Sequence, residues 1–248
     1  MTDRGWALVT GAGRRIGRAL AVAAAESGYD VVVHFRASGD AAAGTAALVE
    51  GAGRQALLAR ADLADPVACI DLIEGSAAQV RLLVNCASVF EDDRIETLSS
   101  TGWDEAMAVN LRAPVLLAQS FARMLPKDAT GLIVNICDQR VWRLNPRFFS
   151  YTLGKAALWA ATQTLAQGLA PRIRVNAIAP GPTLASIHQA PEAFAAEAAA
   201  VPLGRGPDPA EIGAALRYLI DAPSVTGQMI AVDGGQHLAW RTPDLADE

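Results

Sequence analysis

The stretch Thr10-Gly11-Ala12-Gly13-Arg14-Arg15-Ile16-Gly17 lies between a short apolar segment, Trp6–Val9, and an alanine-rich segment that runs from Ile16 to Ser27. The apolar segment predicts a buried strand, and the spacing of small apolar residues after it predicts a helix packed on a sheet. Glycines at such a turn allow close backbone approach, and the free N–H groups of the helix attract a pyrophosphate. The stretch predicts a dinucleotide-binding turn, with an ordinary strand-to-helix loop as the alternative.

Strand-like and helix-like segments alternate along the rest of the chain. Further strands are predicted at Asp30–Phe35, Gln55–Ala61, Arg81–Asn85, Gly131–Cys137, Ile173–Ala179 and Gln228–Val232. Further helices are predicted near 40–52 and at Pro66–Gln79, Asp104–Leu125, Tyr151–Leu169 and Pro209–Asp221. Short strands that are apolar on both faces are typical of a parallel sheet covered on two sides. The pattern predicts an α/β fold, with a single doubly wound Rossmann-type parallel sheet flanked by helices on both faces.

One segment of the chain differs from the rest in composition. Residues 180–209 are rich in alanine and proline, contain a predicted short helix at Pro191–Ala200, and lie between two predicted strands. We expect this segment to be a substrate loop within one domain that spans residues 1–248.

Composition excludes several classes of protein. Of the 248 residues, 52% are hydrophobic, and 21 basic against 26 acidic residues give a net charge of −5. So apolar a chain is not disordered, and an acidic balance argues against a nucleic-acid partner bound by charge. The longest apolar run, Ala19–Ala25, is far shorter than the ~20 residues of a membrane-spanning helix, so we expect no membrane partner.

Cysteine and histidine usage indicates a reducing compartment and predicts no metal site. The three cysteines, Cys69, Cys86 and Cys137, form no CxxC pair and are interpreted as buried free thiols. The three histidines, His34, His188 and His237, are far apart in the sequence. We expect a cytoplasmic protein.

The end of the second predicted strand indicates which dinucleotide is bound. An NAD site of this architecture carries an acid there for the ribose 2′-hydroxyl, but the segment reads His34-Phe35-Arg36-Ala37-Ser38, with no acid before Asp40. Arg36 and Ser38 can hold a 2′-phosphate by charge-assisted hydrogen bonds, and Arg14 and Arg15 add positive charge nearby. The segment favours NADP(H), with solvated surface arginines as the alternative.

Tyr151-Thr152-Leu153-Gly154-Lys155 places a tyrosine and a lysine four residues apart, on one face of a predicted helix. An ammonium beside a phenol stabilises the phenolate, so we expect Lys155 to lower the pKa of Tyr151 and make it a proton donor near neutral pH. An ordinary surface Tyr–Lys pair is the alternative.

Together these features resemble the short-chain dehydrogenase/reductase family over essentially the whole chain. The matching positions are Thr10–Gly17, Asp62-Leu63, Asn85-Cys86-Ala87, Asn110, Tyr151–Lys155, Pro180-Gly181 and Val232-Asp233-Gly234-Gly235. The resemblance implies a cofactor site made by Gly11, Arg14, Arg15, Ile16, Gly17, His34, Arg36, Ser38, Asp62, Leu63, Asn85, Ala87, Tyr151, Lys155, Pro180 and Gly181. It also implies a homo-oligomer, expected to be a tetramer, with His237 and Trp240 at a subunit interface.

Three departures from the usual family pattern indicate one branch of the family. Asp138 stands thirteen residues before Tyr151, where the family usually has a catalytic serine, and Arg15 replaces the middle glycine of the turn. After the fourth predicted strand, Asn85-Cys86-Ala87-Ser88 is followed by Val89-Phe90. These departures resemble the pteridine reductase and dihydromonapterin reductase branch.

That branch implies a reductase of a flat, aromatic pterin. The implied catalytic residues are Asp138, Tyr151, Lys155 and Asn110, and the implied substrate-binding residues are Arg15, Ser88, Phe90, Asp138 and Tyr151. Phe90 would stack on the pterin ring, and Arg15 would reach both the cofactor phosphate and the pterin.

In the implied reaction, the hydride would go from the nicotinamide to a ring carbon. Asp138 would relay a proton through Tyr151 to a ring nitrogen. Lys155 would hold the ribose, and Asn110 would hold a water that links Lys155 to solvent.

A purely structural role stays an alternative at each of these positions. Phe90 can be a core aromatic residue, Asp138 can cap a loop, and Ser88 can be an ordinary loop residue. A general NADPH-dependent carbonyl or 3-oxoacyl thioester reductase is the alternative function. A cofactor-sensing protein that has lost turnover is a third hypothesis, from a different class.

Overall fold

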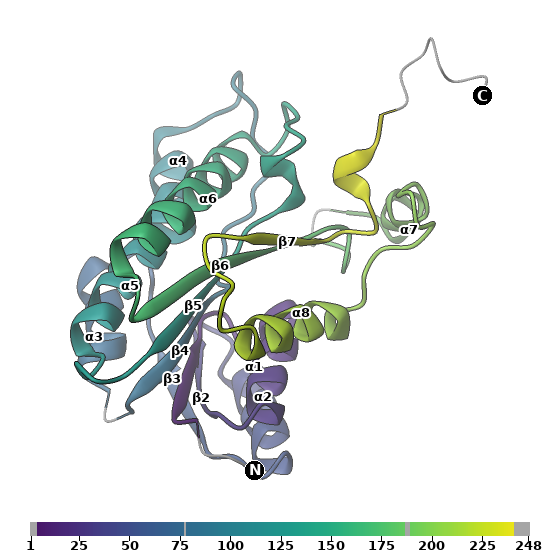
Figure 1. The fold of residues 1–248 in the computed structure, drawn as a ribbon. Coiled ribbons are helices and arrows are strands. Elements are labelled where there is room, and N and C mark those ends of the chain that lie inside the picture. Colours follow the sequence, from purple (N-terminus) through teal and green to yellow (C-terminus); the bar gives the residue numbers. More distant parts are fainter. Residues whose placement is uncertain (1–3, 77, 187–188, 241–248) are drawn as a thin grey trace.

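Seven strands, each parallel to its neighbours, form one sheet in the order β3-β2-β1-β4-β5-β6-β7 (Figure 1). This computed structural model describes residues 4–76, 78–186 and 189–240. The strands are β1 (Trp6–Val9), β2 (Asp30–Phe35), β3 (Ala56–Arg60), β4 (Val80–Asn85), β5 (Gly131–Ile136), β6 (Ile173–Pro180) and β7 (Met229–Val232). The predicted doubly wound parallel sheet is confirmed.

The central strands are buried on both faces, as their sequences predict. In β1, residues Ala7, Leu8 and Val9 are fully buried, and the β-branched run of β2 is almost as well covered. The edge strand β3 is different, because Leu57 and Leu58 are 43% and 50% exposed. The expected coverage of the strands on both faces therefore holds for the middle of the sheet but not for β3, the strand at its edge.

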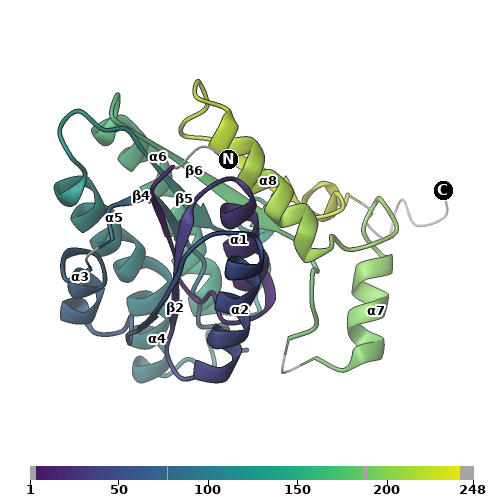
Figure 2. The same cartoon turned by 90° about the horizontal axis from the view of Figure 1, so that it is seen from below.

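Helices cover both faces of the sheet (Figure 2). α1 (Arg15–Glu26), α2 (Gly39–Gly51) and α8 (Pro209–Asp221) lie on one face, and α3 (Pro66–Glu74), α4 (Ser100–Met107), α5 (Ala113–Met124) and α6 (Phe149–Leu169) lie on the other. Each layer has its own apolar core: α1 and α8 bury Leu20 and Leu216, and α5 buries Leu117 and Phe121. α7 (Pro191–Ala199) stands apart and buries none of its side chains.

The helix predicted over Asp104–Leu125 is corrected by the structure into three pieces. Helix α4 begins earlier, at Ser100, because the side chain of Ser99 accepts a hydrogen bond from Gly102 N at 3.1 Å. A five-residue π-helix, η1 (Ala108–Arg112), then joins α4 to α5. Such π-bulges are frequent at functional sites, and this one contains Asn110.

Two short helical turns and the segment after β6 complete the fold. The turns are η2 (Gln139–Val141), directly after Asp138, and η3 (Gln236–Leu238) near the C-terminal end. The expected substrate loop, 180–209, leaves the end of β6 and contains α7. Residues 187 and 188 of that loop, and so His188, lie outside the described residues. Among the described residues, no helix is both long and apolar enough to cross a membrane.

Candidate active site

The predicted site residues gather at the carboxyl ends of the strands, where the sheet changes direction of winding between β1 and β4. This edge is the usual ligand-binding side of an open α/β sheet. The residues that follow each strand end here are Gly11 after β1, Arg36 after β2, Asp62 after β3, Asn85 and Ala87 at and after β4, Asp138 after β5, and Pro180 and Gly181 at and after β6. The tertiary structure thus brings together positions from most of the chain.

The glycine-rich turn has the shape that a dinucleotide needs. Gly11 has a φ of +66°, and a side chain there would come within 3.0 Å of the Cα atom of Ala87. A side chain at Gly17 would lie 2.1 Å from the carbonyl oxygen of Gly11. No side chain caps α1, and its first turn carries no acidic residue. The N–H groups at the start of α1, including those of Ile16 and Gly17, therefore suit a bound pyrophosphate.

His34 forms a hydrogen bond with the backbone of this turn. Its Nδ1 atom accepts a hydrogen bond from Gly11 N at 3.0 Å, and its Nε2 atom lies 3.2 Å from the carbonyl oxygen of Ala61. The ring is therefore neutral, with its proton on Nε2. Burial lowers the pKa of His34 to about 4. Because both ring nitrogens are bonded within the protein, this placement gives His34 an indirect effect on a cofactor, through Gly11.

Arg15 occupies the position of the middle glycine in a backbone conformation that suits glycine. Its φ is +55°, in the left-handed region that side chains rarely adopt. Its guanidinium donates hydrogen bonds to the carbonyl oxygens of Leu184 at 3.0 Å and Ala185 at 2.8 Å. Arg15 therefore links the cofactor turn to the expected substrate loop. The sequence did not reveal this link.

Most of the residues expected around the adenosine end are polar, and two of them, Arg36 and Asp62, are exposed. Arg36 is 58% exposed in its side chain and pairs with Glu105 of α4 at 3.2 Å. Ser38 precedes α2 but makes no capping hydrogen bond with its side chain, which leaves its hydroxyl available. Asp62 accepts a hydrogen bond from Ala64 N at 3.0 Å, and Leu63 is buried beneath it.

Buried polar contacts tie the end of β4 to its neighbours. Thr10 Oγ1 accepts hydrogen bonds from Cys86 N at 2.9 Å and Ala87 N at 3.0 Å. Asn85 donates to Asn135 Oδ1 at 2.8 Å, and Asn135 donates to a threonine of α6. The side chain of Asn85 therefore acts within the protein framework, across adjacent strands.

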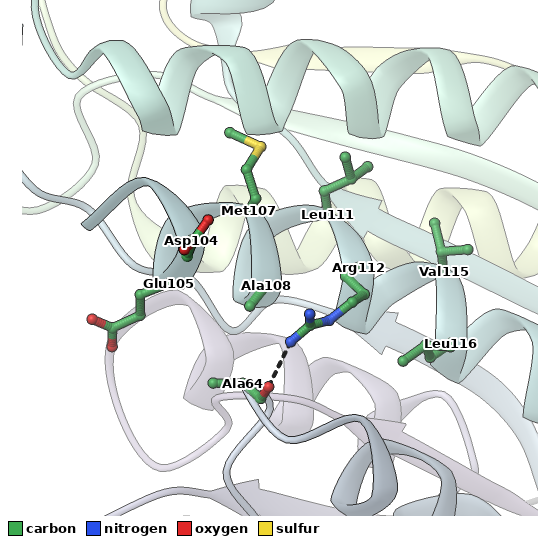
Figure 3. A pocket seen from close by; sticks show the side chains of 9 residues that line it. All are labelled: Ala64, Asp104, Glu105, Met107, Ala108, Leu111, Arg112, Val115 and Leu116. Carbon is green, nitrogen blue, oxygen red and sulfur yellow. Dashed lines mark hydrogen bonds between the residues drawn. The ribbon is translucent and has the colours of Figure 1, made fainter. Parts of the chain in front are cut away.

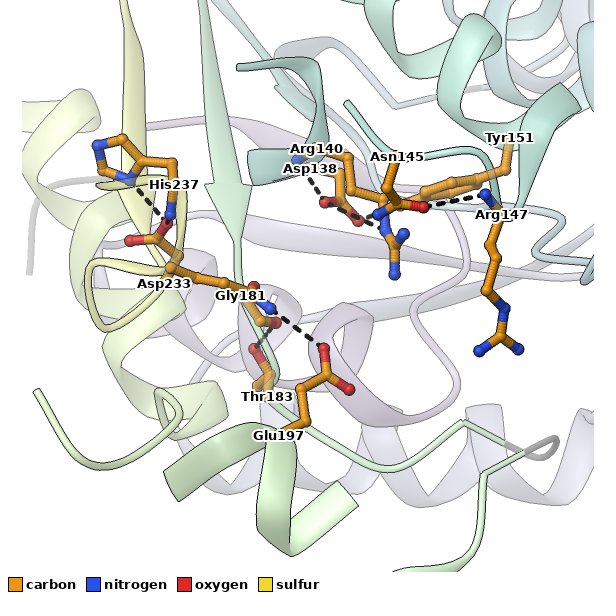
Figure 4. A network of polar contacts seen from close by, with 11 residues as sticks. Asp138, Arg140, Asn145, Arg147, Tyr151, Gly181, Thr183, Glu197, Asp233 and His237 are labelled. Carbon is orange, nitrogen blue, oxygen red and sulfur yellow. Dashed lines mark hydrogen bonds and ion pairs between the residues drawn. The ribbon is translucent and has the colours of Figure 1, made fainter. Parts of the chain in front are cut away.

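Tyr151 and Asp138 form the centre of the site (Figure 4). Tyr151 Oη donates a hydrogen bond to Asp138 Oδ2 at 2.8 Å, and Asp138 Oδ1 accepts one from Arg140 N at 2.8 Å. The guanidinium Nε of Arg140 lies 4.0 Å from the same carboxyl group. Burial raises the pKa of Asp138 above its usual value, which favours a protonated carboxyl group.

The expected effect of Lys155 on Tyr151 is not what the structure shows. Lys155 Nζ donates to the carbonyl oxygen of Ile136 at 2.6 Å and lies 5.7 Å from the centre of the Tyr151 ring. Burial and the adjacent Asp138 carboxyl group raise the pKa of Tyr151 well above 10, and burial lowers that of Lys155. The prediction of a lowered phenol pKa is therefore wrong, because the phenol faces an acid and the ammonium faces a carbonyl.

Asn110 organises the loop after β4. Its Oδ1 atom accepts hydrogen bonds from Ser88 Oγ at 2.8 Å and Val89 N at 3.0 Å, and its Nδ2 atom donates to Val89 O at 2.9 Å. Helix α6 comes close at Gly154, where a side chain would lie 3.2 Å from the Cβ atom of Asn110. The side chain thus holds the loop that leads to Phe90, and a water-carrying role for Asn110 stays a prediction.

Phe90 packs on a residue that the sequence reasoning missed. Its ring stacks on that of Phe148, with centroids 4.1 Å apart, and meets the Tyr151 ring edge-on at 4.7 Å. The guanidinium groups of Arg140 and Arg147 lie 5.0 and 5.3 Å from the centre of the Phe148 ring. The available sequence signal was the pair Phe148-Phe149, which Ser150 separates from Tyr151.

The end of β6 is closed by β7. Gly181 N donates to Val232 O at 3.0 Å, and a side chain at Gly181 would come within 2.6 Å of the Cα atom of Asp233. Asp233 is buried and accepts hydrogen bonds from the backbone and ring of His237 (Figure 4). The turn η3, which contains His237, is thereby held against the chain that follows β7.

A separate groove of about 770 Å³ lies outside this site (Figure 3). It is lined by Met107, Leu111, Val115 and Leu116, and Arg112 donates to Ala64 O at 2.7 Å at its edge. Asn110, Tyr151 and Asp138 do not line it. Within the described ranges, no three histidine, cysteine, aspartate or glutamate side chains are grouped so as to hold a metal ion.

Comparisons with known proteins agree with this geometry. Residues 11–237 match the family model of enoyl-(acyl carrier protein) reductase. A short-chain type dehydrogenase/reductase of Picea abies is 33% identical over 93% of this chain and 91% of its own length. A 3-oxoacyl-[acyl-carrier-protein] reductase of Synechocystis is 32% identical over 92% of this chain and 95% of its own length.

A solved structure gives a closer likeness. The crystal structure of FolM alternative dihydrofolate reductase 1 from Brucella suis, in complex with NADP, has 49% sequence identity and a TM-score of 0.94. The similarity covers 99% of this chain and 100% of that chain. With the glycine-rich turn, the Tyr151–Lys155 pair and the sheet order in place, the chain belongs to the short-chain dehydrogenase/reductase family of oxidoreductases.

Proposed function

We propose that the protein is an NADPH-dependent reductase that converts a pterin, of dihydropterin or dihydrofolate type, to its tetrahydro form. The observation that carries this proposal is the partly buried hydrogen bond of 2.8 Å from Tyr151 to Asp138, which joins two titratable groups at the catalytic position. The FolM alternative dihydrofolate reductases of Brucella suis and Brucella canis, both 49% identical, support the same substrate class.

The turn after β1 and the end of β2 support NADP(H) as the cofactor. Ile16 and Gly17 would bind the pyrophosphate through their backbone N–H groups, since α1 begins without a cap. Arg36, Ser38 and Arg14 would hold the 2′-phosphate, because the end of β2 carries no acid that would repel it. Arg36 would exchange its exposed contact with Glu105 for this phosphate, and an exposed ion pair costs little to break.

The remaining chemistry lies with the side chains. Bound NADPH supplies the hydride for a ring carbon of the pterin. Tyr151 donates its phenolic proton to the adjacent ring nitrogen, and Asp138 returns a proton to the phenol through their 2.8 Å hydrogen bond. The raised pKa of Asp138 supports this role, since the relay requires a protonated carboxyl group.

Other residues would bind and orient the two ligands. Lys155, fixed by Ile136 O, would hold the nicotinamide ribose, and Phe90 would pack against the flat pterin ring. Arg15 lies at the entrance and has a planar fork of donors that matches the acceptors of a pterin edge. Its present contacts with Leu184 and Ala185 are exposed.

The direct test is the oxidation of NADPH with dihydropterins, compared with a panel of ketones and a 3-oxoacyl thioester. The proposal expects turnover of a dihydropterin, with NADPH preferred over NADH. Arg36→Ala is expected to reduce this preference and leave the rate at saturating cofactor nearly unchanged. Turnover of ketones alone would contradict the pterin proposal, and equal use of the two cofactors would contradict the assignment of Arg36.

A second candidate is a general NADPH-dependent carbonyl or 3-oxoacyl thioester reductase. The names of the relatives from Synechocystis and Staphylococcus epidermidis favour it. It predicts that Asp138→Ser, which restores the usual family residue, keeps or improves ketone reduction. Loss of ketone reduction in that variant, with pterin binding intact, would count against it.

We also propose that the protein acts as a cytoplasmic homotetramer, on the basis of the family resemblance alone. The exposed side chains of Leu238 and Trp240, at 62% and 61%, suit a subunit contact near the C-terminal end. Light scattering of the purified protein tests the tetramer, and cell fractionation tests the compartment.

A further inference from the structure

Asp93 contacts the first turn of α6, the helix that carries Tyr151. Its carboxylate accepts hydrogen bonds from Ser150 N, at 3.1 Å to Oδ1 and 3.3 Å to Oδ2, and another from Ser150 Oγ. Its carbonyl oxygen accepts a hydrogen bond from Phe149 N at 3.2 Å. One loop residue therefore satisfies two of the N–H groups at the start of this helix.

Helix α6 has no local cap that could do this. The preceding residue, Phe148, adopts a left-handed conformation with a φ of +54°, and its side chain has no acceptor atom. The first turn of α6 contains no acidic residue. A helix N-terminus has unpaired N–H groups and a partial positive charge, which a carboxylate stabilises. Asp93 supplies that carboxylate from 57 residues before Ser150 in the sequence.

The neighbouring residue, Asp92, holds the chain just before the helix. Arg147 donates from Nε to Asp92 Oδ1 at 3.3 Å, and its Nη2 atom contacts Asp92 Oδ2. Phe148 lies between the two attachment points and stacks on Phe90, which belongs to the same loop as the two aspartates. The loop 90–93 thus contacts the segment 147–151 through a stacked ring pair and two carboxylates.

The position of Tyr151 depends on this attachment. Tyr151 directly follows Ser150 on α6, whereas its hydrogen-bond partner Asp138 lies in the turn after β5. A shift or fraying of the first turn of α6 would change the 2.8 Å separation between the phenol and the carboxyl group. Errors of about 1 Å in the placement of reacting groups can cost on the order of 100-fold in rate.

We propose that Asp93 is a positioning residue for Tyr151. By capping α6 from the loop that carries Phe90, it fixes the phenol relative to both Asp138 and the aromatic wall of the site. This inference rests on the proposed reductase activity only for its kinetic readout, since the contacts themselves are independent of the substrate.

The test compares Asp93→Ala and Asp93→Asn with a matched control, Asp65→Ala. Asp65 caps α3, accepting a hydrogen bond from Val67 N at 2.9 Å, and no proposed site residue lies on that helix. Steady-state kinetics with a dihydropterin, the affinity for NADPH and thermal unfolding are measured for each variant. Asp93→Ala is expected to lower kcat by about 10- to 100-fold, with NADPH affinity within about twofold of the wild type.

The other variants separate positioning from general stability. Asp65→Ala is expected to lower the unfolding temperature but to leave kcat unchanged. Asp93→Asn keeps an acceptor oxygen for Ser150 N and is expected to recover most of kcat. If Asp93→Ala does not fold, Ser150→Ala, which removes the hydroxyl contact and keeps the backbone one, is expected to show a smaller fall in kcat. An unchanged kcat in both Asp93→Ala and Ser150→Ala, or equal losses in Asp93→Ala and Asp65→Ala, would overturn the proposal.

A spectroscopic readout keeps this test distinct from that of the proposed function. If the wild type reduces no substrate, the proposed function fails, but the ionisation of Tyr151 can still be followed by ultraviolet difference spectra, with Tyr151→Phe to subtract the other two tyrosines. In Asp93→Ala, the pKa of Tyr151 is expected to fall, because the phenol moves away from Asp138 and gains water. In Asp65→Ala it is expected to stay unchanged. An unaltered phenol titration in Asp93→Ala contradicts the positioning role.

Discussion

The Nδ1 atom of buried His34 accepts a hydrogen bond of 3.0 Å from the backbone N–H of Gly11, which places a titratable ring directly beneath the cofactor turn. Burial lowers the pKa of His34 to about 4, from 6.5. The folded protein therefore binds this proton less tightly than the unfolded chain does. The stability associated with the neutral ring is fully present above pH 6.5 and is lost as the pH falls through about 4.

We predict that protonation of His34 at acid pH lowers the unfolding free energy of the wild type by up to about 3 kcal/mol. The substitution His34→Phe keeps a ring but removes the acceptor for Gly11 N, which costs about 1–3 kcal/mol of unfolding free energy at neutral pH. The substitution also removes the contribution of His34 to the pH dependence of the unfolding free energy. Denaturant unfolding between pH 7 and pH 4 measures both effects. Parallel pH dependence in the variant and the wild type would refute the prediction.

Asp138 has the opposite dependence on pH. Burial raises its pKa, so the folded state favours the protonated carboxyl group, and the corresponding stability is present at low pH and lost as the pH rises through the raised pKa. Asp138→Asn cannot ionise and is therefore expected to lose less stability than the wild type on going from acid to neutral pH.

The same variant tests the proton relay. Asp138→Asn is expected to lower kcat for a dihydropterin by at least about 100-fold, since general acid–base groups contribute on the order of 10²–10⁴. NADPH affinity serves as the control and is expected to change little. A fully active Asp138→Asn variant would show that the relay does not use this carboxyl group.

Arg15 is predicted to lower the unfolding free energy through its strained backbone while its guanidinium raises kcat/KM for the substrate. Its φ of +55° suits glycine, so Arg15→Gly relieves backbone strain of about 1 kcal/mol while losing two exposed hydrogen bonds to the substrate loop. The unfolding free energy is expected to stay within about 1 kcal/mol of the wild type. By contrast, kcat/KM for a dihydropterin is expected to fall by at least tenfold, about 1.4 kcal/mol.

Arg15→Lys is the matched control for that prediction. It keeps the positive charge and the strained backbone but loses the planar fork of donors, so it is expected to be no more stable than the wild type and to lose activity as well. Chemical denaturation and steady-state kinetics measure the two properties separately. Wild-type activity in Arg15→Gly would exclude a role for the guanidinium.

Phe90 and Phe148 are predicted to be energetically coupled. Their rings stack at 4.1 Å with planes only 11° apart, and such pairs contribute about 0.5–1.5 kcal/mol beyond the burial of their area. A double-mutant cycle with Phe90→Leu and Phe148→Leu, followed by denaturant unfolding, measures this coupling. Phe90→Leu is also expected to raise KM for a dihydropterin more than it changes NADPH affinity. A coupling energy near zero would mean that the two rings act independently.

Much of the fold follows from local sequence patterns. The apolar strands, the Ala-rich helices and the turn Thr10–Gly17 predict the parallel sheet, because strand burial and helix periodicity are local properties. Even the bounds of β2 and α8 agree with the predicted Asp30–Phe35 and Pro209–Asp221. The predicted elements are wrong where tertiary contacts determine the backbone. At η1 the chain widens into a π-helix, and Asn110 in this helix bonds to the loop 88–89.

The sequence by itself determined which chemical groups the site contains. Tyr151 and Lys155 could be named from their spacing on one face of a helix, and Asp138 from the position that it takes in the family pattern. What each group does to the others was decided only by the tertiary structure. Lys155 bonds to Ile136 O while Tyr151 bonds to Asp138, so the pKa of the phenol rises where the spacing predicted a fall.

The same holds for contacts between distant segments. Arg15 and Ala185 are separated by 170 residues of chain, Phe90 and Phe148 by 58, and Asp93 and Ser150 by 57, and no local pattern pairs them. Hydrogen bonds and ring contacts act over a few ångströms, so they are set by which loops the sheet brings to one edge. The sequence therefore determined the sheet and its candidate residues, and the packing of its loops decided their partners and their proton affinities.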